Sequence, residues 1–252
     1  ICISTEKINL ISRSLSLIEI YVIRRFFNGL SAKNTNRFIP SQLLPWIRNN
    51  LNEDKSNYAD LIFTYVYVNA NNFALFSGGE LPSYRMPTDE EFKDNVFKSE
   101  IYKMNSQFCR NFLIRYSKIM NNEQKDLSKY TVEHVMPQDL SVWRQAGINI
   151  DEESHREYLH TIGNLTLTPN NSLYSNFLFS DKQKLMREHE AFVINNDFLY
   201  LDKWGIEEIK SRAEKILDNV NKNWPLSKYK KSLFISNPNT PNTCLLYTSP
   251  SP

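Results

Sequence analysis

Glycine and cysteine are scarce in this chain, and each scarcity excludes a kind of site. Only 6 of the 252 residues are glycine, and neither GxGxxG nor GxxxxGK[ST] occurs, so no loop of the usual kind can cradle a triphosphate. The three cysteines stand far apart and form no CxxC pair. This excludes a zinc site built on cysteine thiolates and favours a reducing, cytoplasmic compartment.

An excess of charge and a long apolar run are also missing. The 30 Lys and Arg residues nearly balance the 28 Asp and Glu residues, so any binding of nucleic acid must come from a local patch. No apolar run approaches the roughly 18 residues that a membrane span needs, so no membrane association is expected. With 41% hydrophobic residues, a chain of this length predicts a folded protein of one or two domains.

Most of the sequence shows the spacing of apolar residues that is typical of helices. Residues 5–27 read as one long helix with a possible C′ glycine at Gly29, and its apolar residues populate one broad face: Ile8, Ile11, Leu15, Ile18, Tyr21 and Ile23. Thr88 and Glu91 have the spacing of a capping box. Further helices are expected over residues 41–51, 88–98, 99–121, 151–160, from 180 onward, and over 205–223. The apolar stretch 58–76 is expected to be a buried helix, although its period is ambiguous.

Two short β-like runs are the exception. The first, residues 130–138, carries Glu133 and His134 and reaches Pro137, which favours a strand end because the residue before proline is held extended. The second, residues 162–171, opens on Gly163-Asn164 and leads to an Asn-rich turn and a helix that carries Lys182. This order of strand, strand and helix is what a one-metal nuclease finger requires.

The residue types fit phosphodiester hydrolysis. A neutral imidazole can deprotonate water, which makes His134 the candidate general base, and a divalent ion can activate the phosphate. Glu133 precedes it, but neighbours on a strand point to opposite faces, so an irregular strand end is needed for both to serve one site. His160 lies close before Asn164 and is the rival histidine to test.

Polar residues around the second run supply the remaining candidates. The amide of Asn164 could fix the loop that holds His134, and an oxygen of Asn171 or Asn176 could bind a hard divalent ion. Lys182 could contact phosphate. Each asparagine could equally be a turn or capping residue, and Lys182 could equally be an ordinary exposed lysine.

These segments resemble the C-terminal nuclease domain of GmrSD-type restriction endonucleases, in the HNH or His-Me finger superfamily. The densest similarity lies in Glu133-His-Val-Met-Pro-Gln138, Ile162-Gly-Asn-Leu-Thr-Leu-Thr168 and Phe179-Ser-Asp-Lys182. The aromatic and basic segment 102–116 and the run from Trp204 to Arg212 agree with it, and the resemblance extends over roughly residues 10–226.

The resemblance implies roles for individual residues. His134 would be the general base and Asn164 the residue that orders the loop. Glu133, where the family often has Asp, would hold the metal directly or through water, and Asn171 would be its other ligand, with Asn176 as the alternative. The cofactor would be Mg²⁺ or Mn²⁺, and the substrate would be double-stranded DNA, including base-modified DNA. Family members resemble fusions to an N-terminal nucleotide-hydrolysing domain, which is expected to be missing from this sequence.

The expected fold is therefore mainly α-helical with a small β-hairpin, carrying a ββα-metal finger. We expect a helical segment over residues 1–97, the nuclease domain over 98–226 and a tail over 227–252, whose last ten residues resemble translated sequencing adaptor. The predicted function is metal-dependent DNA cleavage in a restriction-type defence system. The alternatives are a degenerate finger that binds DNA or a partner without catalysis, and a helical interaction protein with no role on nucleic acid.

Overall fold

The computed structural model of the chain describes residues 5–30, 35–51, 58–72, 80–121, 126–169, 174–189 and 193–230. Its α-helices are α1 (Thr5–Phe27), α2 (Thr35–Phe38), α3 (Leu44–Asn50), α4 (Tyr58–Phe63), α6 (Asp89–Lys98), α7 (Ile101–Met104), α8 (Ser106–Asn121), α9 (Ser141–Gln145), α10 (Glu152–Tyr158), α12 (Phe179–His189) and α13 (Ile206–Asn223). Shorter π- and 3-10-helical segments are η1 (Ile39–Leu43), η2 (Thr64–Asn69), η3 (Ile162–Asn164) and η4 (Val193–Asn195). The strands β1 (Thr131–His134) and β2 (Leu165–Thr168) form one antiparallel pair.

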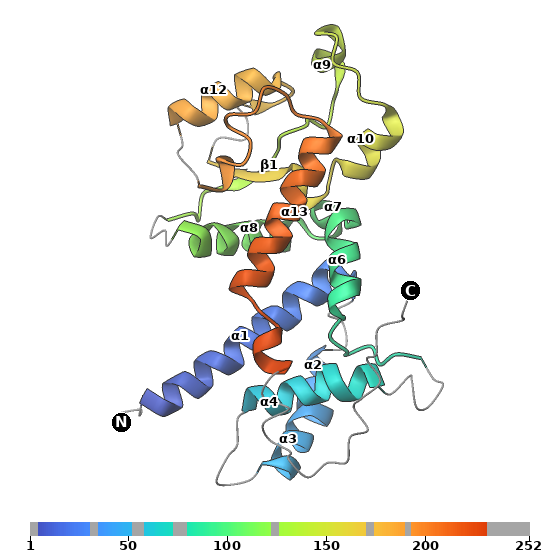
Figure 1. Ribbon diagram of the computed structural model, residues 1–252, viewed down its shortest axis with the longest axis vertical. Coiled ribbons are helices and arrows are strands. Elements are labelled where there is room, and N and C mark those ends of the chain that lie inside the picture. Colours follow the sequence, from blue (N-terminus) through green and yellow to red (C-terminus); the bar gives the residue numbers. More distant parts are fainter. Residues whose placement is uncertain are drawn as a thin grey trace, which may run out of the picture.

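The expected fold class is confirmed at this level: the described chain is mainly helical, with a small β-hairpin. Helix α13 runs from the part of the molecule that holds the hairpin towards α1 (Figure 1). Helix α8 lies between the hairpin and α1 in the same view. Within the described residues, no helix has the length and apolar character that crossing a bilayer would require.

Two apolar clusters form the core, and the hairpin and the segment after β1 contribute to them. The larger cluster contains Leu165 and Leu167 of β2 together with buried residues of α1, α6, α8 and α13. The smaller cluster contains Met136, which follows β1, together with Trp143 and Trp204. The strands therefore pack in the larger cluster, the segment after β1 packs in the smaller one, and all four residues of β2 are buried.

Several expected elements are confirmed. Helix α1 spans Thr5–Phe27, and Gly29 beyond it has a positive φ of 64°, the conformation of a C′ glycine. Thr88 and Glu91 form both bonds of the capping box at the start of α6. The helix expected to begin at residue 41 begins earlier, at Thr35, and continues through a π-helical turn into α3.

Two expected elements are wrong in their boundaries. The single helix predicted over residues 99–121 is divided at Asn105, whose backbone is extended and whose Oδ1 accepts from the backbone N–H of Phe108 at 2.9 Å. Asparagine caps helices in this way, so a new helix starts beside it. The second β-like run was expected to open on Gly163, but Gly163 and Asn164 lie in the 3-10 turn η3 and the strand begins at Leu165.

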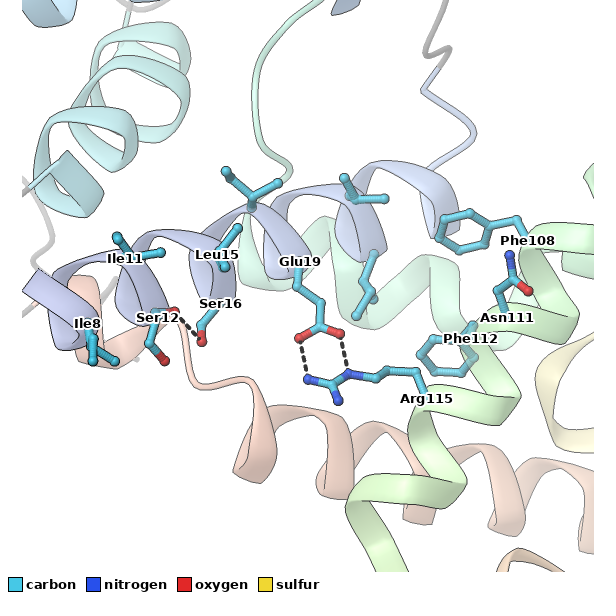
Figure 2. A pocket seen from close by; sticks show the side chains of 13 residues that line it. Ile8, Ile11, Ser12, Leu15, Ser16, Glu19, Phe108, Asn111, Phe112 and Arg115 are labelled. Carbon is cyan, nitrogen blue, oxygen red and sulfur yellow. Dashed lines mark hydrogen bonds and ion pairs between the residues drawn. The ribbon is translucent and has the colours of Figure 1, made fainter. Parts of the chain in front are cut away.

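The face predicted for α1 is wrong over most of its length, because the helix packs into the core through the side that carries Leu17, Ile20 and Phe27. Ile8, Ile11, Leu15 and Ile18 remain 43–60% exposed, whereas Tyr21 and Ile23 are buried. The exposed residues line an open groove of about 890 Å³ between α1 and α8. Figure 2 shows the ion pair between Arg115 and Glu19, at 2.6 Å, that crosses this groove.

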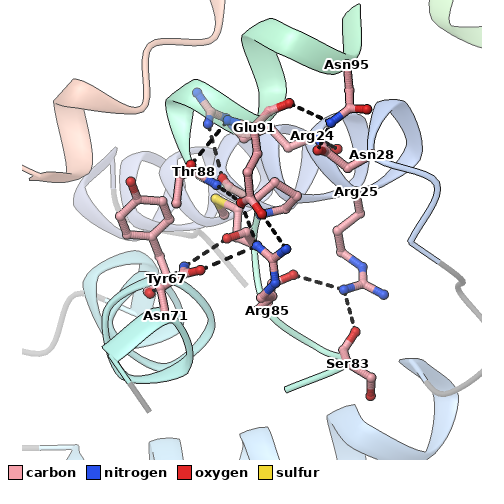
Figure 3. Close-up of polar contacts among 12 residues, drawn as sticks. Arg24, Arg25, Asn28, Tyr67, Asn71, Ser83, Arg85, Thr88, Glu91 and Asn95 are labelled. Carbon is pink, nitrogen blue, oxygen red and sulfur yellow. Dashed lines mark hydrogen bonds and ion pairs between the residues drawn. The ribbon is translucent and has the colours of Figure 1, made fainter. Parts of the chain in front are cut away.

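Arg24 and Arg25 are structural. The Arg24 guanidinium donates to the carbonyl of Pro87 and to Asp89 Oδ1, and Arg25 donates to the carbonyls of Ser83 and Arg85. Figure 3 shows these side chains joining α1 to the segment before α6. Both arginines are buried, so they hold the helical part together and present no free charge to DNA.

Candidate active site

The hairpin positions the predicted residues. In the antiparallel register, Glu133 stands opposite Thr166 and His134 opposite Leu165. The ladder continues past the strand end, where the N–H of Val135 donates to the carbonyl of Asn164 at 2.9 Å. The end of β1 and the start of β2 are therefore fixed against each other, although residues 135–164 separate them in sequence.

Glu133 forms a buried ion pair with Lys182 of α12. Lys182 Nζ lies 2.6 Å from Glu133 Oε1, and it also donates to the backbone carbonyl of His134 at 2.7 Å. Lys182 is 1% exposed and Glu133 is 5% exposed. Burial raises the pKa of Glu133 and lowers that of Lys182, while the opposite charge of each partner counteracts that effect. A single lysine thus fastens α12 to two consecutive residues of β1.

The ring of His134 has different partners. Its Nε2 lies 3.1 Å from Nδ1 of His160, and the ring of Tyr102 meets it edge-on at 4.7 Å between centroids. Tyr102 also stacks on His160, at 5.8 Å and 13°. Burial first, and then the nearby charges of His160, Lys182 and His155, lower the pKa of His134 to about 3. The imidazole is therefore neutral near pH 7, the form that can accept a proton.

Asn164 uses both ends of its amide to hold the loop after β1. Its Oδ1 accepts from the N–H of Met136 at 2.7 Å and from Nε1 of Trp204 at 3.1 Å. Its Nδ2 donates to the carbonyls of Met136 and Leu159, at 3.0 and 2.9 Å. The residue is fully buried, so these four bonds satisfy it and lock the backbone just beyond His134.

Gly163 is required by a close approach of α13. A Cβ at this position would lie 2.2 Å from the carbonyl oxygen of Ile209. Arg212, on the same helix, donates to the carbonyls of Gly163 and Leu165 at 2.9 and 2.7 Å. Helix α13 therefore rests directly on the turn that presents Asn164.

The structure brings only some of the candidate residues together. Glu133, His134, Asn164 and Lys182 surround the end of β1, through the contacts described above. Asn176 instead donates from Nδ2 to Asp139 at 3.0 Å. Asn171 lies outside the described residues.

Three residues at the site were not assigned a role from the sequence. His160 was recognised only as a rival histidine, whereas Tyr102 and Trp204 appeared only in the wider resemblance. The short spacing from His160 to Asn164 is the one local signal, because a residue so near the start of β2 must lie near the end of β1 once the strands pair. The contacts of Tyr102 and Trp204 depend on tertiary packing.

The donors present fit a divalent ion in part. Glu133 offers a carboxylate, and His134 and His160 offer imidazole nitrogens, but Glu133 Oε1 already binds the ammonium of Lys182. Across the part of the chain that the structure describes, no three His, Cys, Asp or Glu side chains form a group able to hold a metal ion.

The family model for the C-terminal domain of GmrSD restriction endonucleases matches residues 86–219, which include the hairpin, α12 and most of α13. The match covers more than half of the chain, and the chain therefore belongs to this family. No curated protein and no solved structure matches the chain. The family identifies the chain as the nuclease part of a restriction protein, with DNA as its substrate.

Proposed function

We propose that this chain is a metal-dependent DNA endonuclease of the HNH type. It would act in a modification-dependent defence system, with the hairpin and α12 as its ββα-metal finger. The observation that carries the proposal is the placement of the His134 imidazole at the end of β1, with its backbone carbonyl held by Lys182 and the following loop held by Asn164. A rigidly placed neutral imidazole is what a general base requires.

His134 takes a proton from the attacking water in this proposal. An imidazole with a pKa of about 3 is a weak base, but an anionic phosphate beside it stabilises the protonated form and raises that pKa. The strength of the base would therefore increase when DNA is bound. Asn164 keeps the strand end in place, and Lys182 anchors β1 to α12 while it balances the charge of Glu133.

A divalent ion, Mg²⁺ or Mn²⁺, would polarise the scissile phosphate and stabilise the leaving oxygen when bound. Glu133 would hold it together with the amide oxygen of Asn171, because the side chain of Asn176, the alternative ligand, is hydrogen-bonded to Asp139. Because Lys182 binds Glu133 Oε1, the ion would share this carboxylate with the lysine.

A supercoiled plasmid assay tests the proposal. The wild-type chain should nick or linearise double-stranded DNA in Mg²⁺ or Mn²⁺ and should stop when EDTA removes the ion. Parallel reactions on unmodified and base-modified plasmids report the modification preference. Absence of any metal-dependent product on either plasmid would refute the enzymatic proposal.

A non-catalytic finger that binds DNA or a partner is the alternative function. The observation that favours it is the pairing of Glu133 with Lys182, because this pairing leaves less negative charge to attract a cation. Such a module should bind a labelled duplex with equal affinity in Mg²⁺ and in EDTA, measured by fluorescence anisotropy, and should cut it in neither.

A further inference from the structure

The ring of His134 is held by a second histidine, and this contact bears on which nitrogen can act as the base. His134 Nε2 and His160 Nδ1 lie 3.1 Å apart, within hydrogen-bonding distance. A hydrogen bond between two ring nitrogens needs one proton, carried by one nitrogen and accepted by the other. The two possible placements of that proton have opposite consequences for His134.

If the proton sits on His160 Nδ1, the lone pair of His134 Nε2 is used to accept it. A neutral His134 then carries its own proton on Nδ1, and neither of its nitrogens is free to accept a proton from water. If instead the proton sits on His134 Nε2 and is donated to His160, the lone pair of His134 Nδ1 is free. Only the second arrangement leaves His134 able to act as a base.

We propose that His160 is a positioning residue that accepts a hydrogen bond from Nε2–H of His134, and so leaves His134 Nδ1 free to take the proton from water. The inference rests on the proposed function, because it assumes that His134 is the base. A partner on one imidazole nitrogen commonly decides the tautomer and orientation of the ring, and with them the reactivity of the other nitrogen.

The surroundings of His160 hold it in place for this task. The ring of Tyr102 stacks on it and touches the ring of His134 edge-on, so one aromatic residue supports both imidazoles. The backbone N–H of Tyr102 also donates to the carbonyl of His160 at 3.4 Å. His160 lies in the turn after α10, four residues before Asn164, so the two residues that fix the end of β1 share one short segment.

Two substitutions at position 160 test the inference. His160→Leu removes the acceptor while it keeps an apolar side chain under Tyr102. His160→Asn places an amide oxygen close to the former position of Nδ1. At saturating metal, kcat for plasmid cleavage should fall roughly 10- to 100-fold in His160→Leu, with KM for DNA little changed, and should recover to within about threefold of wild type in His160→Asn.

The wild type and His134→Ala are measured beside these variants. If the wild type does not cut DNA, or His134→Ala cuts as fast as wild type, the proposed function fails. If those two behave as proposed but His160→Leu cuts within about twofold of wild type, or His160→Asn is as slow as His160→Leu, only the role of His160 fails.

A measurement that is independent of activity uses ¹⁵N-histidine-labelled protein. The ring nitrogens of the four histidines are observed by NMR near pH 7, and the signals lost in His134→Gln are assigned to His134. The inference predicts that His134 carries its proton on Nε2. A proton found on Nδ1 of His134 would overturn it, whatever the kinetics.

Discussion

Replacing Lys182 by methionine removes the only positive charge that the described structure places on the buried carboxylate of Glu133. Methionine keeps the length and much of the volume of the lysine stem, so the change isolates the ammonium group. Two losses follow: Glu133 Oε1 loses its partner, and the carbonyl of His134 loses a donor at 2.7 Å. Removing one partner of a buried pair costs about 3–5 kcal/mol.

The pH dependence of this loss makes the prediction specific. Without Lys182, Glu133 can avoid an unpaired buried charge by taking up a proton. For a carboxyl with an ordinary pKa of 4.5, that uptake costs about 3.4 kcal/mol at pH 7 but about 0.7 kcal/mol at pH 5. The unpaired carbonyl adds about 1–2 kcal/mol at both pH values. Lys182→Met should therefore lower the free energy of unfolding by about 4–5 kcal/mol at pH 7 and by about 2–3 kcal/mol at pH 5.

Urea unfolding followed by tryptophan fluorescence measures these values, provided that the m-value is unchanged. Glu133→Gln and the double variant complete a double-mutant cycle, in which we expect a coupling energy of about 2–3 kcal/mol at pH 7. The exposed pair of Arg115 and Glu19 is the matched control, and its coupling should stay below about 1 kcal/mol. A cost for Lys182→Met that is below about 1 kcal/mol, or is equal at the two pH values, would refute the reasoning.

Three further predictions concern the same segment. Asn164→Ala leaves the partners of four hydrogen bonds unsatisfied and should lower the free energy of unfolding by about 3–4 kcal/mol in urea titrations, with a loss below about 1 kcal/mol arguing against its role in the loop. Gly163→Ala places a Cβ against the carbonyl of Ile209 and should cost about 3 kcal/mol or more, whereas a thermal midpoint equal to wild type would contradict the close approach. Burial lowers the pKa of His134 from 6.5 to about 3, so the unfolded chain binds this proton first as the pH falls. His134 therefore destabilises the fold increasingly below about pH 6.5, until the effect is complete near pH 3. His134→Gln should flatten the acid side of the stability profile, and profiles of equal slope would count against it.

Local signals predicted much of the fold. The 3.6-residue period of apolar residues correctly predicted both ends of α1, and the spacing of Thr88 and Glu91 correctly indicated a capping box. The break at Asn105 was missed because asparagine within an otherwise helical pattern is only a weak signal, and its capping bond to Phe108 decides the outcome. The buried side of α1 was not predicted, because apolar residues occupy two sides of this helix and periodicity alone did not show that the side with Leu17 and Ile20 is the one that packs into the core.

The order of the candidate site residues along the chain was predictable, but which of their side chains contact one another was not. The sequence correctly placed Glu133 and His134 at the end of a strand and Lys182 on a helix, whereas Asn164, expected in the second strand, lies in η3 just before it. It did not reveal that Lys182 would bind Glu133, because the two residues are 49 positions apart in sequence and the segment between them can fold in many ways. Nor did it reveal that the ring of His134 would meet His160, a contact that requires the antiparallel register of β1 and β2.

The most direct test of the account is the rate at which His134→Ala cleaves DNA. Wild type and variant are compared under single-turnover conditions in Mg²⁺ and Mn²⁺, at equal fractions of folded protein established by circular dichroism. If His134 is the general base, the variant should cleave at least about 100-fold more slowly while it binds the same duplex with similar affinity. Equal cleavage rates for the two folded proteins would contradict the central claim.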